Sequence, residues 1–454
     1  MPNVSADPTI PARLPIKTLL RGHSPGQLIV QVSDACNARC PQCELRADNS
    51  FKRSRIPIDR LKRIIDSAAE KGIQSLSFTG GEPFLLGDEL FDIIRYAGQA
   101  GIRYTRTGTN AFFLRGADQP DWEDKVRRIA EKLADTPLYT FWISIDSADA
   151  GVHEEMRGLP GAIKGIERAL PIFHEYGVYP AANLGVNRNT GGRWPTERRQ
   201  AARLARPEAF LDAFRRSFAR FYRTVVDMGF TMCNACYPMS IQGSESQMLE
   251  MVYGASAENF LVKFAREEKA LLFRAMRETI PRFADRLRIF TPLTSLYALE
   301  RHYSGKPGNS YACRGGIDYF FVDAQKGHTY PCGFRGCEDL GPFEALDSSK
   351  LEKTPWCREC DWECYRDPSE LLGPVTELFR HPLRLAGRFL RDPRFFSLWL
   401  RDVRYYRAAE FFNGRRAADY EALKPFLGRG TPQDPRSQDL LNAVYVKPVQ
   451  ATAD

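Results

Sequence analysis

Three cysteines near the start of the chain are spaced closely enough to hold one metal centre. Cys36, Cys40 and Cys43 lie within eight residues, directly after Gln27–Ser33, which reads as a short strand. Three thiolates can hold three irons of a cubane cluster and leave the fourth iron without a protein ligand. Such an open position allows a metal centre to bind and activate a substrate. A closed zinc site usually has four ligands, and only His23 lies within reach as a fourth, so we favour an open iron–sulfur centre.

A glycine-rich turn follows one strand–helix unit later. Gly80-Gly81-Glu82-Pro83 comes directly after Ser75–Thr79, which we predict to be a strand. Glycines expose backbone groups and let a ligand approach closely. Taken alone, the same four residues are equally compatible with an ordinary turn. Their position after the cysteines favours a role in the same site.

The elements that would position both motifs alternate between strands and helices from Gln27 to about Tyr237. We expect strands at 27–33, 75–79, 103–107, 138–145, 178–184 and 230–233, and helices at 58–69, 89–101, 123–134, 161–176 and 207–228. About six such units imply parallel strands with right-handed crossovers, fewer than a closed eight-stranded barrel needs. We therefore predict an α/β fold with a partial, open (β/α)6 barrel. In such folds the chemistry gathers at the carboxyl ends of the strands.

Composition and charge are those of a globular chain without a membrane-spanning segment. Of the 454 residues, 43% are hydrophobic and 26% charged, and no run of eighteen apolar residues occurs. The N-terminus lacks the basic start and apolar stretch of a secretion signal, so we expect a cytoplasmic protein. In that compartment clustered cysteines bind metal more often than they form disulfides, and most of the eleven cysteines here are clustered. The net charge of +8 fits surface solvation or an acidic partner.

The Cys-x3-Cys-x2-Cys spacing and the Gly-Gly-Glu-Pro turn together resemble the radical S-adenosylmethionine (SAM) superfamily. The resemblance implies a [4Fe–4S] cluster on Cys36, Cys40 and Cys43, whose unique iron binds the amino and carboxylate groups of SAM. It also implies reductive cleavage of SAM to methionine and a 5′-deoxyadenosyl radical. One position departs from the pattern, since Gln42 stands where many members have an aromatic residue near the adenine.

The same resemblance implies contacts to SAM at the ends of several strands. The backbone of the turn, with Glu82 nearby, would receive the SAM ammonium group, and a guanidinium suits the carboxylate because it donates two parallel hydrogen bonds. The implied residues are Gly80, Gly81, Glu82, Pro83, Ser144, Arg157 and Asn183, with Thr109 and Asn110 as further polar contacts. For Arg157, a surface ion pair with Glu154 or Glu155 is the alternative.

A second group of cysteines lies between residues 313 and 364. Its opening, Cys313 to Cys332 with Gly327 between them, resembles that of SPASM and twitch domains, the auxiliary-cluster modules of radical SAM maturases. No cysteine follows Cys364, so the complete SPASM pattern is not reached. We expect one auxiliary [4Fe–4S] cluster, with a zinc ribbon as the structural alternative. The expected ligands are Cys313, Cys332, Cys357 and Cys360, with Cys337 and Cys364 as alternates.

The remaining segments complete the predicted organisation. We expect an N-terminal extension (1–26), the partial barrel (27–240) with an Arg-rich surface insertion (186–206), a helical bridge (241–310), a small cysteine-rich domain (311–366), basic amphipathic helices (367–425) and a disordered tail (426–454). Cys233 and Cys236 end the sixth predicted strand. We interpret them as buried reduced thiols, with a redox or radical-relay role as the alternative.

One of the basic helices has an aromatic face and a face of arginines. At 100° per residue, the first contains Phe395, Phe396, Trp399, Leu400, Val403 and Tyr406, and the second Arg394, Arg401 and Arg404. We expect the aromatic face to pack on the barrel. A helix lying on an anionic membrane surface is the alternative, which would make the protein membrane-associated and favour a lipid substrate.

Together these features predict a radical SAM oxidoreductase, or C–H functionalising enzyme, with a SPASM/twitch-like domain. The resemblance points first to a peptide substrate, as in the maturation of ribosomally made peptides, with a lipid or small metabolite as the alternative. It implies an electron donor such as flavodoxin or ferredoxin. No RNA-binding module is evident, so we expect no nucleic-acid partner. A non-catalytic zinc or iron–sulfur protein is the alternative from another class, but a purely structural cluster would need neither the glycine-rich turn nor Arg157.

Overall fold

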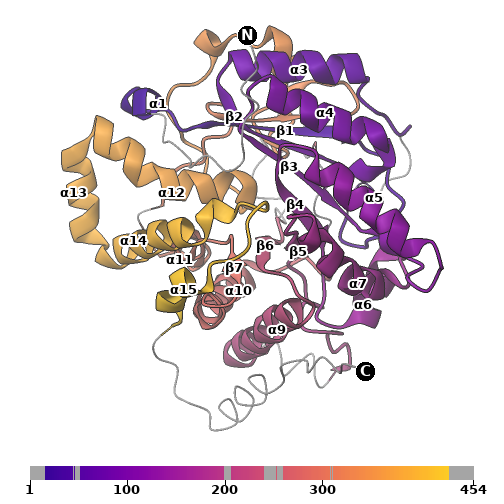
Figure 1. Ribbon diagram of the computed structural model, residues 1–454. Helices are drawn as coiled ribbons and strands as arrows, with labels where there is room; N and C mark the ends of the chain where they lie inside the picture. Colours follow the sequence, from indigo (N-terminus) through magenta and orange to yellow (C-terminus); the bar gives the residue numbers. More distant parts are fainter. Residues whose placement is uncertain are drawn as a thin grey trace.

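A single sheet runs through the protein. The computed structural model describes residues 16–43, 45, 52–198, 206–239, 252, 259–306, 308 and 310–428. Within these residues, nine strands form the order β7-β6-β5-β4-β3-β2-β1-β8-β9 (Figure 1). They are β1 (Gly26–Ser33), β2 (Ile73–Gly80), β3 (Tyr104–Thr109), β4 (Leu138–Ser144), β5 (Ala181–Gly185), β6 (Met232–Cys236), β7 (Arg288–Ile289), β8 (Tyr319–Val322) and β9 (Thr329–Tyr330). All neighbours from β7 to β8 are parallel, and β9 is antiparallel to β8.

Helices connect the first six strands and follow one another around one side of the sheet (Figure 1). They are α3 (Ile58–Glu70), α4 (Asp88–Gln99), α5 (Trp122–Ala134), α6 (Ala150–Arg157), α7 (Ala162–Glu175) and α9 (Pro207–Asp227). Gly72 has a positive φ of 74° just after α3, a conformation common where helices end. The predicted partial (β/α)6 barrel is therefore confirmed, with α6 as an additional short helix.

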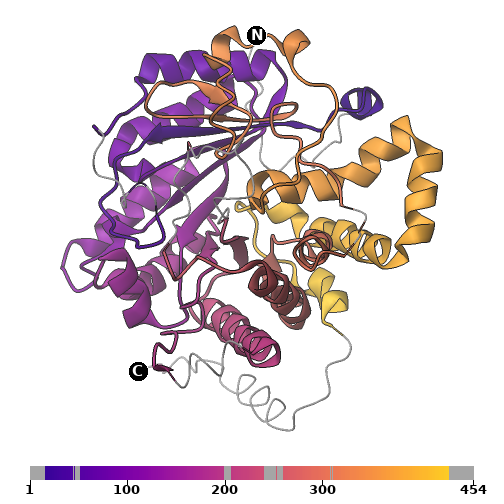
Figure 2. The same cartoon turned by 180° about the vertical axis from the view of Figure 1, so that it is seen from behind.

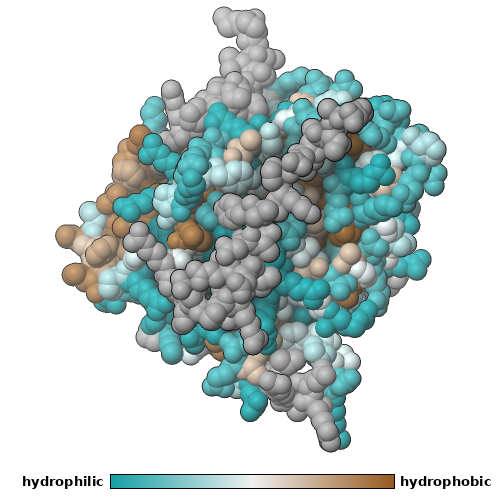
Figure 3. Space-filling view, turned by 60° about the horizontal axis from the view of Figure 1, so that its bottom comes forward, coloured by the Kyte–Doolittle hydropathy of each residue, from teal (hydrophilic) through white to brown (hydrophobic). Residues whose placement is uncertain are grey.

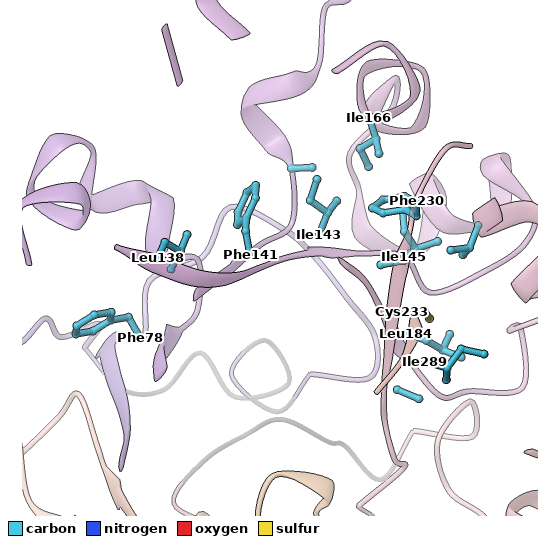
Figure 4. Packing of buried hydrophobic residues seen from close by; sticks show 14 of the residues in the cluster. Phe78, Leu138, Phe141, Ile143, Ile145, Ile166, Leu184, Phe230, Cys233 and Ile289 are labelled. Carbon is cyan, nitrogen blue, oxygen red and sulfur yellow. The ribbon is translucent and has the colours of Figure 1, made fainter. Parts of the chain in front are cut away.

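An apolar core lies between the sheet and these helices. Successive side chains of a strand face opposite sides, so alternate residues such as Leu28, Val30 and Val32 of β1 join this core. Figure 4 shows Phe141 and Ile143 of β4 on the side of their strand that faces α7. The other side of the strands carries more polar residues and is the inside of the open barrel.

The sheet extends beyond the six predicted strands at both edges. At one edge β7 pairs with β6 and lies between α10 (Arg266–Thr279) and α11 (Leu293–Tyr303), within the predicted helical bridge. At the other edge β8 pairs with β1, from Gln27↔Tyr319 to Val30↔Val322. β8 and β9 belong to the second cysteine group, whose orange segment lies beside the N-terminal strands in Figure 2. The cysteine-rich segment is thus attached to the barrel through the sheet itself.

The Arg-rich insertion is partly built into the protein interior. Arg188 is 6% exposed, and its guanidinium lies 4.5 Å from the ring centre of Phe264 and 2.8 Å from Glu268 Oε2. The predicted surface location is therefore wrong for Arg188, because an aromatic ring and a carboxylate satisfy its charge inside the protein. Arg193 is exposed as predicted and pairs with Glu155. Residues 199–205 of the insertion lie outside the described residues.

Four further helices follow the second cysteine group and lie at the left of Figure 1. They are α12 (Glu363–Arg380), α13 (Pro382–Arg391), α14 (Pro393–Ala408) and α15 (Tyr420–Leu423). Phe395 and Phe396 of α14 are buried against Tyr297 of α11, as we expected. The described residues contain no helix that is long and apolar enough to cross a membrane. Of the predicted terminal segments, residues 1–15 and 429–454 lie outside the described residues, and α1 (Ile16–Leu20) precedes β1.

The aromatic face predicted for α14 is only partly buried. Leu400 and Val403 are 43% and 44% exposed, so the prediction is wrong for these two residues. The helix is turned so that Asp402 faces inward instead. Its carboxylate accepts hydrogen bonds from the backbone N–H groups of Leu293 (3.2 Å) and Thr294 (2.7 Å) at the start of α11. These N–H groups have no partner within their own helix, so a buried carboxylate satisfies them.

Candidate functional site

The loop that leaves the carboxyl end of β1 carries Cys36, Cys40 and Cys43. Burial raises the pKa of the Cys40 thiol to about 12, nearby Arg157 lowers it, and the neighbouring Cys43 and Cys36 add to the rise. The Cys36 sulfur accepts hydrogen bonds from the Ala38 backbone N–H at 3.4 Å and from Asn110 Nδ2 at 3.8 Å. Thiols must lose their protons to bind metal, and the charge of bound iron offsets the cost of burial. The donor set fits a cluster held by three thiolates.

The Gly-Gly-Glu-Pro turn packs directly on the start of this loop. Gly81 N donates to Ser33 O at 2.8 Å, and Glu82 N donates to Ala35 O at 2.9 Å. A Cβ at Gly80 would lie 2.1 Å from Ser33 O, and one at Gly81 would lie 2.1 Å from Ala35 O. Only glycine allows this approach of two backbones. The turn therefore fixes the position from which the cysteine loop begins.

Glu82 joins the turn to the end of β3. Its carboxylate accepts hydrogen bonds from Thr109 Oγ1 (2.8 Å), Asn110 N (2.6 Å) and Phe84 N (3.1 Å). Burial raises the pKa of Glu82 to about 7, and these hydrogen bonds oppose the rise. Thr109 and Asn110, predicted as further polar contacts, thus hold Glu82 in place. Pro83 follows as the first residue of a short 3-10 helix, Pro83–Leu86.

Arg157, at the end of α6, lies against the cysteine loop. Its carbonyl accepts a hydrogen bond from Arg39 N at 2.8 Å, and its Nη2 is 2.9 Å from Asp146 Oδ2. The surface ion pair with Glu154 or Glu155 is therefore wrong. The Nε of Arg157 is fully buried and has no hydrogen-bond partner among the described residues. This donor is available to a ligand bound beside the thiols, which fits the carboxylate contact implied for SAM.

Asp146 connects Arg157 to the other side of the site. Its Oδ2 also accepts from Gln42 Nε2 at 2.9 Å, and its backbone N–H donates to His153 Nδ1 at 3.0 Å. Gln42, which stands where an aromatic residue was expected, therefore ties the cysteine loop to Asp146. Asp146 was not among the predicted site residues, although its position two residues after Ser144, just beyond the end of β4, was a usable signal.

Ser144, the last residue of β4, lies opposite Asn183, which is in the middle of β5. Asn183 Oδ1 accepts hydrogen bonds from Asn234 Nδ2 at 3.0 Å and from Cys236 Sγ at 3.5 Å. Cys236 thus faces the inside of the barrel with Asn183. Its neighbour Cys233 points the other way, into the apolar core beside Leu184 and Ile289 (Figure 4). The two thiols of this pair lie on opposite sides of β6.

The second cysteine group brings its four predicted ligands together in one buried cluster. Cys313, Cys332, Cys357 and Cys360 pack with Tyr319, Phe321, Phe334 and Trp362. Burial raises the pKa of Cys313 to about 11 and of Cys332 to about 12, and nearby thiols add to both shifts. Backbone N–H groups two residues further on donate to Cys313 Sγ and Cys332 Sγ at 3.4 Å, as Ala38 does to Cys36. Such bonds stabilise thiolate ligands.

The two alternate ligands, Cys337 and Cys364, differ in exposure and contacts. Cys337 is exposed, whereas the Cys364 thiol donates a hydrogen bond to Glu363 Oε1 at 3.4 Å. Within the described residues, no three His, Cys, Asp or Glu side chains converge closely enough to hold a single metal ion.

Comparison with known proteins gives a family match for most of the barrel. Residues 30–198 match the family model described as the radical SAM superfamily. The chain is 30% identical over 174 residues to the AdoMet-dependent heme synthase of Oleidesulfovibrio alaskensis, covering 38% of this chain and 42% of that protein. It is 29% identical over 148 residues to the GTP 3′,8-cyclase of Tolumonas auensis, covering 31% and 40%. The chain therefore spans less than half the length of these relatives.

Two solved structures of low sequence identity are also among the matches. The structure described as "Native anSMEcpe with bound AdoMet" has a TM-score of 0.44 and 18% identity, covering 72% of this chain and 80% of that one. Streptococcus suis SuiB bound to S-adenosylmethionine has a TM-score of 0.45 and 17% identity, covering 73% and 66%. Residues 30–198 are thus similar to the radical SAM superfamily. That superfamily uses a [4Fe–4S] cluster and SAM, so these two expected cofactors are confirmed at the level of the family.

Proposed function

From the similarity of residues 30–198 to the radical SAM superfamily, we propose that the protein cleaves SAM reductively and uses the 5′-deoxyadenosyl radical to abstract hydrogen from a substrate. The observation that carries this proposal is the buried Arg157 with its unpartnered Nε, held by Asp146 beside Cys36, Cys40 and Cys43. A structural metal site needs no such donor next to its ligands. A cluster bound to the three thiolates supplies the electron for the cleavage.

The chain's own residues have separable tasks in this site. Gly80 and Gly81 set the backbone on which the cysteine loop rests, and their exposed carbonyl groups would receive the SAM ammonium group. Arg157 would hold the SAM carboxylate with the donors that Asp146 leaves unused. Ser144 and Asn183 would face the ribose from β4 and β5. An electron donor such as flavodoxin or ferredoxin completes the proposal.

We also propose that Cys313, Cys332, Cys357 and Cys360 hold one auxiliary [4Fe–4S] cluster. Their common burial and the N–H···S hydrogen bonds support this assignment. The likeness of this segment to the auxiliary-cluster modules of maturases makes a peptide the first choice of substrate. A short peptide encoded beside the gene is the substrate to test, by its change in mass after incubation with the reconstituted enzyme, SAM and reductant. An unchanged mass would remove the support for that peptide as substrate.

Cleavage of SAM is the direct test of the proposed reaction. Anaerobically reconstituted protein with dithionite should form 5′-deoxyadenosine, measured by chromatography. The variant Cys36→Ala/Cys40→Ala/Cys43→Ala should form none, because the open iron needs all three thiolates. A matched control is Cys233→Ala, which removes a thiol on the far side of β6. Undiminished cleavage in the triple variant would refute the assignment.

An exposed apolar surface on α13 favours a second possibility, in which the substrate is a lipid at an anionic membrane. No residue of α13 is buried, and Leu383 and Leu390 are 88% and 81% exposed. The exposed residues Leu378, Phe379 and Phe389 lie on the same helical hairpin, and hydrophobic residues gather at the left edge of Figure 3. Beside them, a pocket is lined by Lys353, Arg358, Arg380, Arg384 and Arg388, with Glu377 as the acidic residue. Exposed apolar side chains flanked by arginines suit an anionic phospholipid surface.

Vesicle co-sedimentation tests this second possibility. Leu383→Ser/Leu390→Ser should abolish binding to anionic vesicles and leave the melting temperature unchanged, because neither side chain is packed. The matched control, Phe395→Ser/Phe396→Ser, should lower the melting temperature, since each ring is buried and its loss costs about 3–5 kcal/mol. Failure of the unmodified protein to bind anionic vesicles would exclude the membrane and leave the peptide.

A further inference from the structure

Arg106 lies inside the barrel, on the same side of the sheet as the predicted SAM contacts. It is the third residue of β3, and its guanidinium lies 5.6 Å from the ring centre of Trp142 on β4. Trp142 and Ser144 are two residues apart on β4, so they share a face and are separated by about 7 Å along the strand. Cys364 and Tyr365, in the first turn of α12, lie close enough to Arg106 to act on its pKa, in the direction that raises it.

Among the described residues, the guanidinium of Arg106 makes no hydrogen bond or ion pair. Its Nε is fully buried without an acceptor, although the side chain as a whole is only partly buried. Burial lowers the pKa of Arg106, as expected for an unpaired cation. A buried donor without an acceptor is unfavourable, so a ligand that accepts a hydrogen bond from this guanidinium would stabilise the arrangement.

Arg288 shows how the same residue type is satisfied when its role is structural. It lies on β7 and is buried, and its guanidinium donates to the carbonyl groups of Asn413 and Arg416, each at 3.0 Å. Thr231 supplies two more acceptors, its Oγ1 at 3.1 Å and its carbonyl oxygen at 3.5 Å, so four acceptors hold Arg288 in place. Arg106 has no such acceptors among the described residues.

We propose that Arg106, seated on the ring of Trp142, binds a carboxylate or phosphate group of the substrate inside the barrel. The planar guanidinium donates two parallel hydrogen bonds to either group, and the aromatic ring fixes its plane. This site rests on the proposed function, since it places the anionic group on the face that holds Ser144 and Asn183. It narrows the substrate to a molecule with an anionic group close to the atom that loses hydrogen. For a peptide, the group is an acidic side chain or the terminal carboxylate.

Thermal unfolding of the reconstituted enzyme with SAM tests the site without using its activity. The probes are N-acetyl-Gly-Glu-Gly amide, the matched N-acetyl-Gly-Gln-Gly amide and pyrophosphate, all at equal ionic strength. The acidic peptide or pyrophosphate should raise the melting temperature of the unmodified protein by about 2 °C or more, and the neutral peptide should not. A rise with the peptide assigns a carboxylate, and a rise with pyrophosphate alone assigns a phosphate.

Two variants separate a binding role from a structural one. Arg106→Gln should weaken the anion about 10- to 100-fold, the loss typical of a hydrogen bond to a charged group, without lowering the melting temperature of the ligand-free protein. Arg288→Gln, the matched control, should lower that temperature and leave anion binding intact. The proposal is overturned if neither anion stabilises the unmodified protein, if Arg106→Gln binds as well, or if Arg106→Gln destabilises the protein as Arg288→Gln does.

The anion site and the proposed radical reaction are tested by different measurements. Cleavage of SAM without substrate is measured on the unmodified protein and reports on the radical reaction alone. Absence of this cleavage would refute the radical reaction, while the anion measurement still stands. Cleavage by the unmodified protein together with weaker anion binding by Arg106→Gln is the result expected when both are right.

Discussion

Replacing Arg157 by Gln removes the cation that balances a buried carboxylate. The Arg157 and Asp146 side chains are 11% and 1% exposed and lie 2.9 Å apart, so the change leaves Asp146 charged and largely unpaired. Breaking a buried pair in this way costs about 3–5 kcal/mol. Asp146 keeps its hydrogen bonds from Gln42 at 2.9 Å and Gly185 at 3.3 Å, so we expect the lower end, about 3 kcal/mol.

A double-mutant cycle measures this coupling. Asp146→Asn removes the charge that Arg157 balances, so Arg157→Gln should cost only about 1 kcal/mol in that background, a coupling of about 2 kcal/mol. Urea unfolding of the four reconstituted proteins gives the free energies, and equilibrium dialysis gives the affinity for SAM. Affinity should fall in both variants that lack Arg157. Equal costs of Arg157→Gln in the two backgrounds, or an unchanged affinity for SAM, would refute the role assigned to this pair.

Three further changes have outcomes fixed by the structure. Gly81→Ala places a Cβ 2.1 Å from Ala35 O, so it should lower the free energy of unfolding in urea by about 1–3 kcal/mol and weaken SAM binding. The control Gly101→Ala, whose added Cβ meets nothing within 4 Å, should leave SAM binding unchanged. Burial raises the pKa of Glu363 from its usual 4.5 to about 7, so the folded state favours the protonated carboxyl group. The folding stability that this group contributes is therefore present below pH 4.5 and is lost as the pH rises through 7. Glu363→Gln should abolish this loss of about 3 kcal/mol between pH 4.5 and 8, and parallel pH profiles of the two proteins would contradict it. Iron analysis should give about eight irons per chain in the unmodified protein and about four in the Cys36→Ala/Cys40→Ala/Cys43→Ala variant. About four irons together with bound zinc in the unmodified protein would favour a zinc ribbon in place of the auxiliary cluster.

The barrel could be predicted from sequence because its signals are local. Short strands alternate with helices that have a regular apolar period, and Gly72 marks one of the helix ends. β7 has only the residues Arg288 and Ile289, too few to show a period. β8 is an apolar run inside a segment interpreted through its cysteines, and only its pairing with β1 shows that it extends the sheet.

The candidate site was predictable where residue type and spacing carry the chemistry, and not where partners come from distant elements. The cysteines and the glycine-rich turn are motifs in one stretch of chain. The importance of Asp146 depends on its contacts to Gln42 and Arg157, and that of Arg106 on the lack of an acceptor for its Nε among the described residues. Neither property is visible in a sequence. The orientation of α14 was missed for the same reason, since Asp402 turns toward the start of a different helix.

Electron paramagnetic resonance of the dithionite-reduced protein, recorded with and without SAM, tests most directly whether an open iron on Cys36, Cys40 and Cys43 binds SAM. The iron that lacks a protein ligand should bind SAM, so addition of SAM should change the spectrum of the unmodified protein. The variant Cys36→Ala/Cys40→Ala/Cys43→Ala should keep only the signal of the auxiliary cluster, and SAM should leave that signal unchanged. A spectrum of the unmodified protein that does not respond to SAM, or the same response in the triple variant, would contradict the site proposed for these three cysteines.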